Sequence, residues 1–266
     1  ALAKALNVKA DYFFRPYTVE IENVEFRKKR KLQVKNINAI KQKVSDFVER
    51  YLEVEQFLNI ESAFENPVAD LEITSKKDVE KAANKVRTVW KLGFNAISNV
   101  IDVLEDKEIK VVEIEAPDEF DGFSGWADKK IPVIVINKGY TVERKRLTAF
   151  HELGHLLLNL PDSLSGREKE RFCFQFAGAM LIPQSTFSQE TGKHRSHFSQ
   201  PELIAIKETY GISVQAIMAR AKDLDVINES QFISFRKWIS RNLSEEGLGT
   251  FRGLEQPFRF KQLIYR

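Results

Sequence analysis

Residues 147–158 read LTAFHELGHLLL and contain two histidines, His151 and His155, separated by three residues. In an α-helix, residues i and i+4 lie one above the other on the same face, so both imidazoles can reach one metal ion. Glu152 lies about 100° further round the helix. From there it can contact a water on the metal, but it is poorly placed to bind the metal itself. This stretch therefore predicts a helix that carries a metal site.

The pattern HExxH is typical of a catalytic zinc site. Zinc binds imidazole and carboxylate ligands, and a catalytic zinc keeps one coordination position for water. Glu152 would then take a proton from the water as general base, and the hydroxide would attack a carbonyl carbon. The alternative is a pair of histidines that are partly exposed, or held in the core by ordinary hydrogen bonds. The apolar neighbours favour the metal, because burying imidazoles and a carboxylate without a partner is costly. These neighbours are Phe150, Leu153, Leu156, Leu157 and Leu158.

A third protein ligand is needed, and the sequence offers three candidates. Glu170 is the strongest, because it lies on the next predicted helix, beyond the loop PDSLSG at 161–166. Glu168 on the same helix is the second candidate. Cys173, the only cysteine of the chain, is the third, although a lone cysteine among apolar residues is more typical of a small core residue.

The segments HELGHLLL (151–158) and EKERFCFQFAGAMLIP (168–183) together resemble the ImmA/IrrE family of bacterial metallopeptidases. The resemblance implies that His151, His155 and Glu170 bind zinc and that Glu152 is the catalytic base. Phe174 stands where many members have a polar Asn or Asp. Other residues match the packing signature of the family: Cys173, Phe176, Ala177, Leu181 and Pro183.

The family resemblance also implies a fold and a function. The fold would be α+β, a zincin-like domain with helices around a small sheet of three or more strands. The activity would be zinc-dependent endopeptidase cleavage of a cytosolic protein, a transcriptional repressor whose loss switches on stress, mobile-element or defence genes. The start of the chain, ALNVKADYFF, resembles the final helix of an XRE-type helix-turn-helix domain. DNA would be contacted only through the part of that domain that lies upstream of Ala1.

A different class of function is a DNA-binding transcriptional regulator whose metallopeptidase-like domain senses a ligand or binds a partner without proteolysis. The resemblance to a helix-turn-helix domain supports it, as do the eight basic residues, with no acidic one, between Phe26 and Lys43. A solvated linker explains this basic stretch better than a phosphate-binding segment, because the net charge is only +3. The intact Glu152 favours the enzyme, since a pure sensor has no need of the base. A structural zinc domain fits poorly, because it would close its fourth position with Cys or His.

The family resemblance, together with the hydrophobic pattern, implies a division of the chain into four parts. Residues 1–16 are the expected remnant of the DNA-binding domain, 17–66 a linker with a long amphipathic helix, 67–240 the metallopeptidase domain, and 241–266 a tail over the surface. Within these parts, 3–4 spacing predicts helices on both sides of Asn66-Pro67, from about 141 to 160, from about 167 to 181, and as a hairpin over 201–227. Short stretches rich in apolar residues and bounded by Gly and Pro predict strands over 110–116, 122–127 and 131–137.

Composition indicates the class of protein and the compartment in which we expect it. The chain has 266 residues with 43% hydrophobic and 30% charged side chains, which is ordinary for a globular protein. We find no apolar run long enough for a membrane span and no signal-peptide pattern, so we expect a cytoplasmic protein without a membrane partner. A single cysteine agrees with a reducing compartment. The oligomeric state is left open.

Two further features bear on the reaction. A group that stabilises the developing oxyanion is usually needed, and His194, His197, Tyr210 and Arg220 are chemically capable of it. The strand 131–137 could present an edge to which an extended peptide adds. Its near-continuous apolar run favours the alternative, a strand buried within the sheet.

Overall fold

The structure is a computed structural model that describes residues 21–22, 34–61 and 63–266 of the chain. A four-stranded sheet in the order β1-β3-β4-β2 lies at its centre. The strands are β1 (Ile21–Glu22), β2 (Lys110–Ile114), β3 (Gly122–Ala127) and β4 (Ile131–Asn137). β3 is antiparallel to both β1 and β4, whereas β2 runs parallel to β4. β4 is therefore an inner strand, buried except at Ile131. This confirms the favoured prediction of a buried strand and excludes the alternative of an edge for an added peptide.

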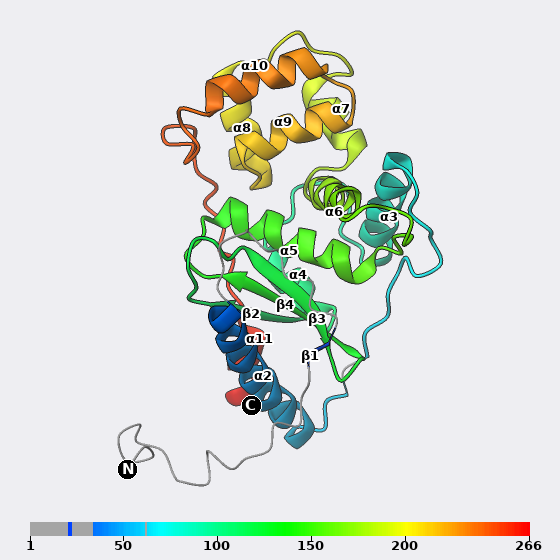
Figure 1. Cartoon of the computed structure of the whole chain (residues 1–266), viewed down its shortest axis with the longest axis vertical. Helices are drawn as coiled ribbons and strands as arrows, with labels where there is room; N and C mark the ends of the chain where they lie inside the picture. Colours follow the sequence, from blue (N-terminus) through cyan, green and yellow to red (C-terminus); the bar gives the residue numbers. More distant parts are fainter. Residues whose placement is uncertain (1–20, 23–33, 62) are drawn as a thin grey trace.

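The alternation of side chains along these strands creates two apolar faces. Phe123, Val133 and Val135 pack towards α2 (Val34–Phe57), in a cluster with Val44. Ile134 and Ile136 of β4 point to the other face and belong to the larger core beneath α5 (Val142–Leu157). Figure 1 shows the result as three layers, with α5 on one side of the sheet and α2 on the other.

Two capped helices carry the predicted metal ligands. α5 begins after Thr141, whose hydroxyl accepts a hydrogen bond from the backbone of Arg144. α6 (Gly166–Leu181) begins after Ser165, which forms a capping box with Glu168. Figure 1 shows α5 along its length and α6 nearly end-on, so the two helices cross. α5 ends three residues before the predicted boundary at 160, because Leu158 is extended and Asn159 bridges to Glu72.

The remaining helices surround this centre. α3 (Lys76–Val89) packs against α6, and α4 (Val100–Asp106) packs against α5 and β2. α8 (Gln200–Tyr210) and α9 (Val214–Asp223) form the predicted hairpin, turning at Gly211 with φ of 61°. Figure 1 places this hairpin above α5, together with α7 (Gln184–Thr191) and α10 (Glu229–Ile239), which hydrophobic periodicity did not reveal.

The C-terminal segment runs down the side of the molecule from α10 to α11 (Arg259–Ile264). There Phe260 packs against Phe47 and Tyr51 of α2, with ring centroids 4.9 and 5.1 Å away. Two carboxylates of this segment, Glu245 and Glu255, are buried.

These elements confirm the α+β prediction, a largely helical chain around a small mixed sheet. The expected helix-turn-helix remnant at 1–16 lies outside the described residues, as does the basic stretch up to residue 33. Among the described helices, none combines the length and the apolar composition that crossing a bilayer requires.

Candidate metal centre

The crossing of α5 and α6 brings three predicted ligands together. The Nε2 atoms of His151 and His155 lie 3.1 Å apart. The Glu170 carboxylate completes the triangle, with Oε2 3.3 Å from Nε2 of His151 and Oε1 3.4 Å from Nε2 of His155. The histidine side chains are almost fully buried, whereas that of Glu170 is 36% exposed. The triangle therefore lies at the edge of the core, with Glu170 on its open side.

The size of this triangle fits a zinc ion. Zn–N and Zn–O bonds of about 2.0–2.1 Å in a tetrahedron place neighbouring ligand atoms about 3.3 Å apart. The two imidazole nitrogens are 3.1 Å apart, each lies 3.3–3.4 Å from a different oxygen of Glu170, and with one ligand atom per residue all three lie within 4.8 Å of one another. Two imidazoles and one carboxylate are also a donor set of catalytic zinc sites, in which the fourth position is left for water or substrate. The residues present thus suit zinc in both geometry and chemistry.

The two other candidate ligands have different roles. The Glu168 side chain accepts hydrogen bonds from the backbone and hydroxyl of Ser165 at the exposed start of α6. Cys173 is buried and packs against Gly154. Neither belongs to the triangle, so the choice of Glu170 from the sequence agrees with the geometry.

The pKa values of Glu170 and His155 indicate that the cluster of His151, His155 and Glu170 favours a bound cation. Hydrogen bonds to His151 and His155 hold the pKa of Glu170 well below its ordinary range. Burial lowers the pKa of His155, but interactions with Cys173 and Glu170 raise it more, to about 11. The cluster therefore attracts a cation, and a proton competes with a metal for the same atoms.

Glu152, the predicted base, is held next to the ligand-bearing helix face by a contact with the sheet. Its side chain is buried, and Oε2 accepts a hydrogen bond from the hydroxyl of Ser124 on β3 at 2.9 Å. Sequence reasoning missed Ser124. Its only signal in the sequence is a hydroxyl two residues after Gly122 in a predicted strand. The packing of β3 against α5 decides which helix that hydroxyl meets.

Phe174 packs its ring against that of His151, with centroids 4.1 Å apart and an angle of 37° between the planes. At this position the family resemblance suggested a polar residue that would support a ligand. Here an aromatic side chain restricts the orientation of His151 by packing.

The segment that carries the triangle also matches a known family model. Residues 104–222 match the model of the Peptidase_M78 family, described as the IrrE N-terminal-like domain. This match extends from α4 to α9, includes all three ligands and Glu152, and supports both the ImmA/IrrE resemblance and a peptidase activity. A search of curated proteins finds no match to the chain.

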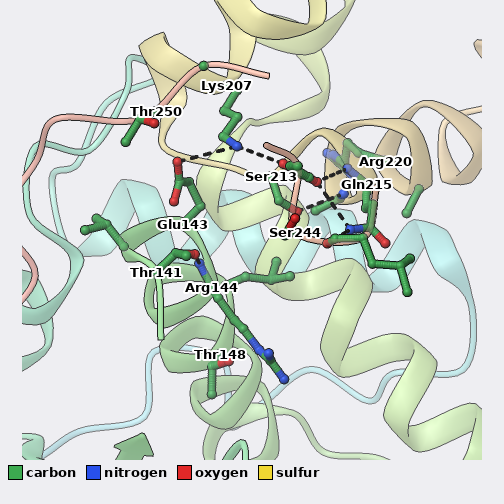
Figure 2. Close-up of a pocket in the computed structure, with 18 of the residues that line it drawn as sticks. Thr141, Glu143, Arg144, Thr148, Lys207, Ser213, Gln215, Arg220, Ser244 and Thr250 are labelled. Atoms are coloured by element: carbon green, nitrogen blue, oxygen red, sulfur yellow. Dashed lines mark hydrogen bonds and ion pairs between the residues drawn. The ribbon is translucent and has the colours of Figure 1, made fainter. Parts of the chain in front are cut away.

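A large cleft lies beside the helices that carry the candidate ligands, and neither these ligands nor Glu152 are among its lining residues. It has a volume of about 1590 Å³ and is lined by α5, α6, α9 and the C-terminal segment 243–252. Phe174, which packs on His151, and Thr148, one turn before Glu152, belong to its wall. Figure 2 shows Arg144 and Thr148 along α5 and Lys207 on the opposite side. Residues 144, 148 and 152 follow one stripe of α5, so the cleft leads along this helix towards the base.

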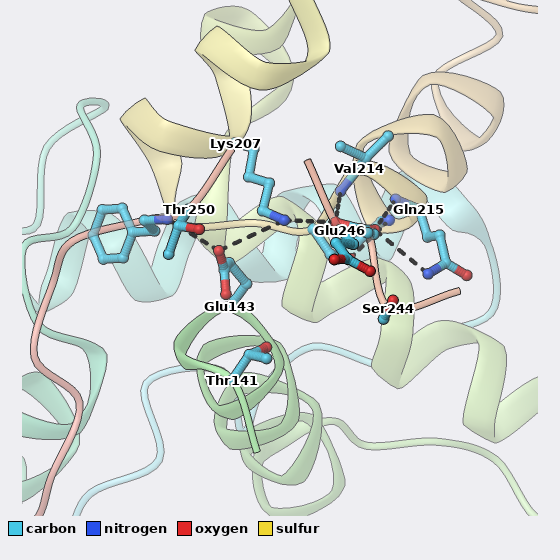
Figure 3. Close-up of polar contacts among 12 residues, drawn as sticks. Thr141, Glu143, Lys207, Val214, Gln215, Ser244, Glu246 and Thr250 are labelled. Atoms are coloured by element: carbon cyan, nitrogen blue, oxygen red, sulfur yellow. Dashed lines mark hydrogen bonds and ion pairs between the residues drawn. The ribbon is translucent and has the colours of Figure 1, made fainter. Parts of the chain in front are cut away.

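A buried ionic network forms part of the cleft wall. Lys207 donates to Glu245 at 2.9 Å and lies 3.8 Å from Glu143 of α5 (Figure 3). Glu245 also accepts hydrogen bonds from the backbone N–H groups of Val214 and Gln215, at the start of α9. Charged acceptors at a helix N-terminus are favourable. The network therefore ties the C-terminal segment and the α8–α9 hairpin to α5.

The four residues predicted as candidates to stabilise the oxyanion make their contacts away from the triangle of ligands. Arg220 forms a buried bidentate pair with Glu80 and donates to the carbonyl of Ile182. Tyr210 donates to Glu190 of α7 at 2.7 Å. His194 and His197 are exposed, and His197 borders a smaller groove beside α10. In the structure, none of the four belongs to the triangle of His151, His155 and Glu170.

Proposed function

We propose that the protein is a zinc-dependent endopeptidase that cleaves a cytosolic protein. The observation that carries this proposal is the triangle of His151, His155 and Glu170, with separations of 3.1–3.4 Å and the buried carboxylate of Glu152 beside it. The peptidase family match to the same segment supports it independently.

The two histidines and Glu170 would hold the ion. A bound zinc supplies Lewis acidity, which lowers the pKa of a water and polarises a carbonyl. Glu152 accepts the proton that the attacking water loses and passes it to the leaving nitrogen as the C–N bond breaks. Phe174 and Cys173 exclude water from the inner side of the ligands, which strengthens the electrostatic interactions there.

The cleft indicates the form of the substrate. Ligand sites for small molecules usually enclose about 300–1,000 Å³, and this cleft is larger at about 1590 Å³. We infer that an extended segment of a protein lies along α5, past Arg144 and Thr148, with its scissile bond near Glu152. By family resemblance the substrate would be a transcriptional repressor, whose cleavage would release stress, mobile-element or defence genes.

The test compares the wild-type protein with Glu152→Gln. Both should contain one zinc per chain when purified without chelator, because Glu152 is not a ligand. Only the wild type should generate new protein N-termini when it is expressed in cells and the N-termini are profiled by mass spectrometry. Wild-type protein without stoichiometric zinc would sink the proposal, as would identical N-termini in the two samples.

The non-proteolytic regulator is a separate outcome, motivated by the resemblance of residues 1–16 to a helix-turn-helix domain. Glu152→Ala in the full-length protein separates the two functions. Regulation in cells that survives this change would assign the working activity to DNA or partner binding rather than to cleavage.

A further inference from the structure

Ser124 lies where a strand of the sheet meets the HExxH helix. Ser124 is 2% exposed, and its hydroxyl donates to Oε2 of Glu152 at 2.9 Å. On the strand, Ser124 is paired with Ile134 of the inner strand β4. The donor therefore stands on one of the most constrained parts of the chain rather than on a loop.

The strand reaches α5 because Gly122, two residues earlier on the same face, has no side chain. A Cβ atom on Gly122 would lie 2.6 Å from the carbonyl oxygen of Val135 and 3.0 Å from Cγ2 of Thr148. It would also lie 3.7 Å from Cγ of Glu152. Any larger residue would clash with the backbone of β4 and with Thr148 of α5, so β3 and the hydroxyl of Ser124 would have to shift. The small residues of GFSGWA (122–127) thus permit the contact between strand and base.

We infer that Ser124 is a positioning residue for the proposed peptidase, an inference that rests on the proposed role of Glu152. A glutamate side chain has three rotatable bonds, and its carboxylate must meet the reacting water within a few tenths of an ångström. The hydrogen bond from Ser124 holds one carboxylate oxygen and thereby orients the other to exchange the proton. The hydroxyl acts through Glu152 and does not itself contact the substrate.

The experiment uses the zinc-loaded full chain and the Ser124→Ala variant. We expect kcat for cleavage of a protein substrate identified by N-terminal profiling to fall by about 10- to 100-fold. This is the usual cost of losing a group that orients an active-site residue. KM and zinc stoichiometry should stay unchanged, because neither the cleft wall nor the ligands are altered. Ser199→Ala is the matched control. It removes a serine that caps the exposed start of α8, so it should leave kcat unchanged.

A second measurement does not depend on activity. Ser124→Ala should lower the melting temperature in the wild-type background, and by less in a Glu152→Ala background, because the partner is then already absent. A wild-type kcat for Ser124→Ala, or equal melting shifts in the two backgrounds, would overturn the inference. An inactive but zinc-loaded wild type would count against the proposed function alone, since the melting cycle would still test the contact.

Discussion

Gly154 packs so closely against Cys173 that a Cβ atom on residue 154 would lie 3.2 Å from both Cα and Cβ of the cysteine. The glycine is the residue of HELGH directly before the second histidine, and Cys173 follows Glu170 by one turn of α6. The missing side chain therefore sets the distance at which the two ligand-bearing helices cross. Because α6 also packs on α3, it has little freedom to retreat.

We predict that Gly154→Ala weakens zinc binding. Alanine improves helix propensity by up to about 1 kcal/mol, but crowding a packed interface typically costs about 1–3 kcal/mol. The displaced α6 would carry Glu170 away from the histidines. Zinc affinity, measured by competition with a chromophoric chelator, should fall by about tenfold. Gly166→Ala is the control, since a Cβ there meets nothing within 4 Å. Equal affinities in the two variants would refute the role of the close approach.

Glu170 and Glu168 allow a direct test of the third ligand within one helix. Glu170→Gln should lower zinc affinity by about 10- to 100-fold or more and abolish activity, because it removes a negative charge and one metal–oxygen bond. Glu168→Gln should keep both, since that side chain caps the start of α6 at Ser165. Zinc content after dialysis, measured by mass spectrometry, distinguishes the variants. Zinc loss in Glu168→Gln instead would mean that the ligand had been misassigned.

Much of the metal site could be predicted because its information is local. Helical periodicity alone places His151, Glu152 and His155 on neighbouring faces, and their separation along the helix does not depend on the rest of the fold. Glu170 needed one further step, the assumption that consecutive helices pack together. The sequence also holds a local clue to the choice between Glu168 and Glu170. Ser165 and Glu168 have the spacing of a capping box, in which the side chain of Glu168 binds the start of the helix and not a metal.

The missed features depend on contacts between distant parts of the chain. Ser124 meets Glu152 only because β3 packs against α5, and no periodicity in residues 122–127 reports that contact. Glu255 reads as an ordinary surface glutamate, yet it pairs with Arg146, a residue 109 positions earlier in the chain. Sequence patterns reveal which faces are apolar, but the pairing of buried charges depends on the tertiary arrangement.

Zinc affinity should increase with pH. The pKa of His155 is raised to about 11 by Cys173 and Glu170 in spite of its burial. The imidazole is therefore protonated at neutral pH when no metal competes, and zinc must displace that proton. Between pH 6.5 and 8.5 the apparent affinity should rise by up to about tenfold per unit for each proton released. Competition titrations at several pH values measure the slope. An affinity that is independent of pH would contradict a shared proton in the cluster.

The C-terminal segment should stabilise α5 through a buried ion pair. Glu255 pairs with Arg146, and its carboxylate also accepts hydrogen bonds from the backbone of Val100 and Ile101 at the start of α4. Removing one partner of a buried pair typically costs about 3–5 kcal/mol, so Glu255→Gln should lower the free energy of unfolding in urea by that amount. The control is Glu115→Gln, whose pair with Lys138 is exposed and should contribute at most about 1 kcal/mol. Equal losses in both variants would show that burial of the pair is unimportant.

Narrowing the cleft should impair binding of a protein substrate without affecting the metal. Ala219, a half-buried residue of α9, lines the cleft. We expect Ala219→Trp to raise KM for a protein substrate identified by N-terminal profiling, by about tenfold or more, because an indole would occupy the path of the extended segment. Ala219→Ser, which barely changes the volume, should behave as the wild type, and zinc content should be equal in all three proteins. If the tryptophan variant cleaves the protein substrate with an unchanged KM, the substrate must approach Glu152 from outside this cleft.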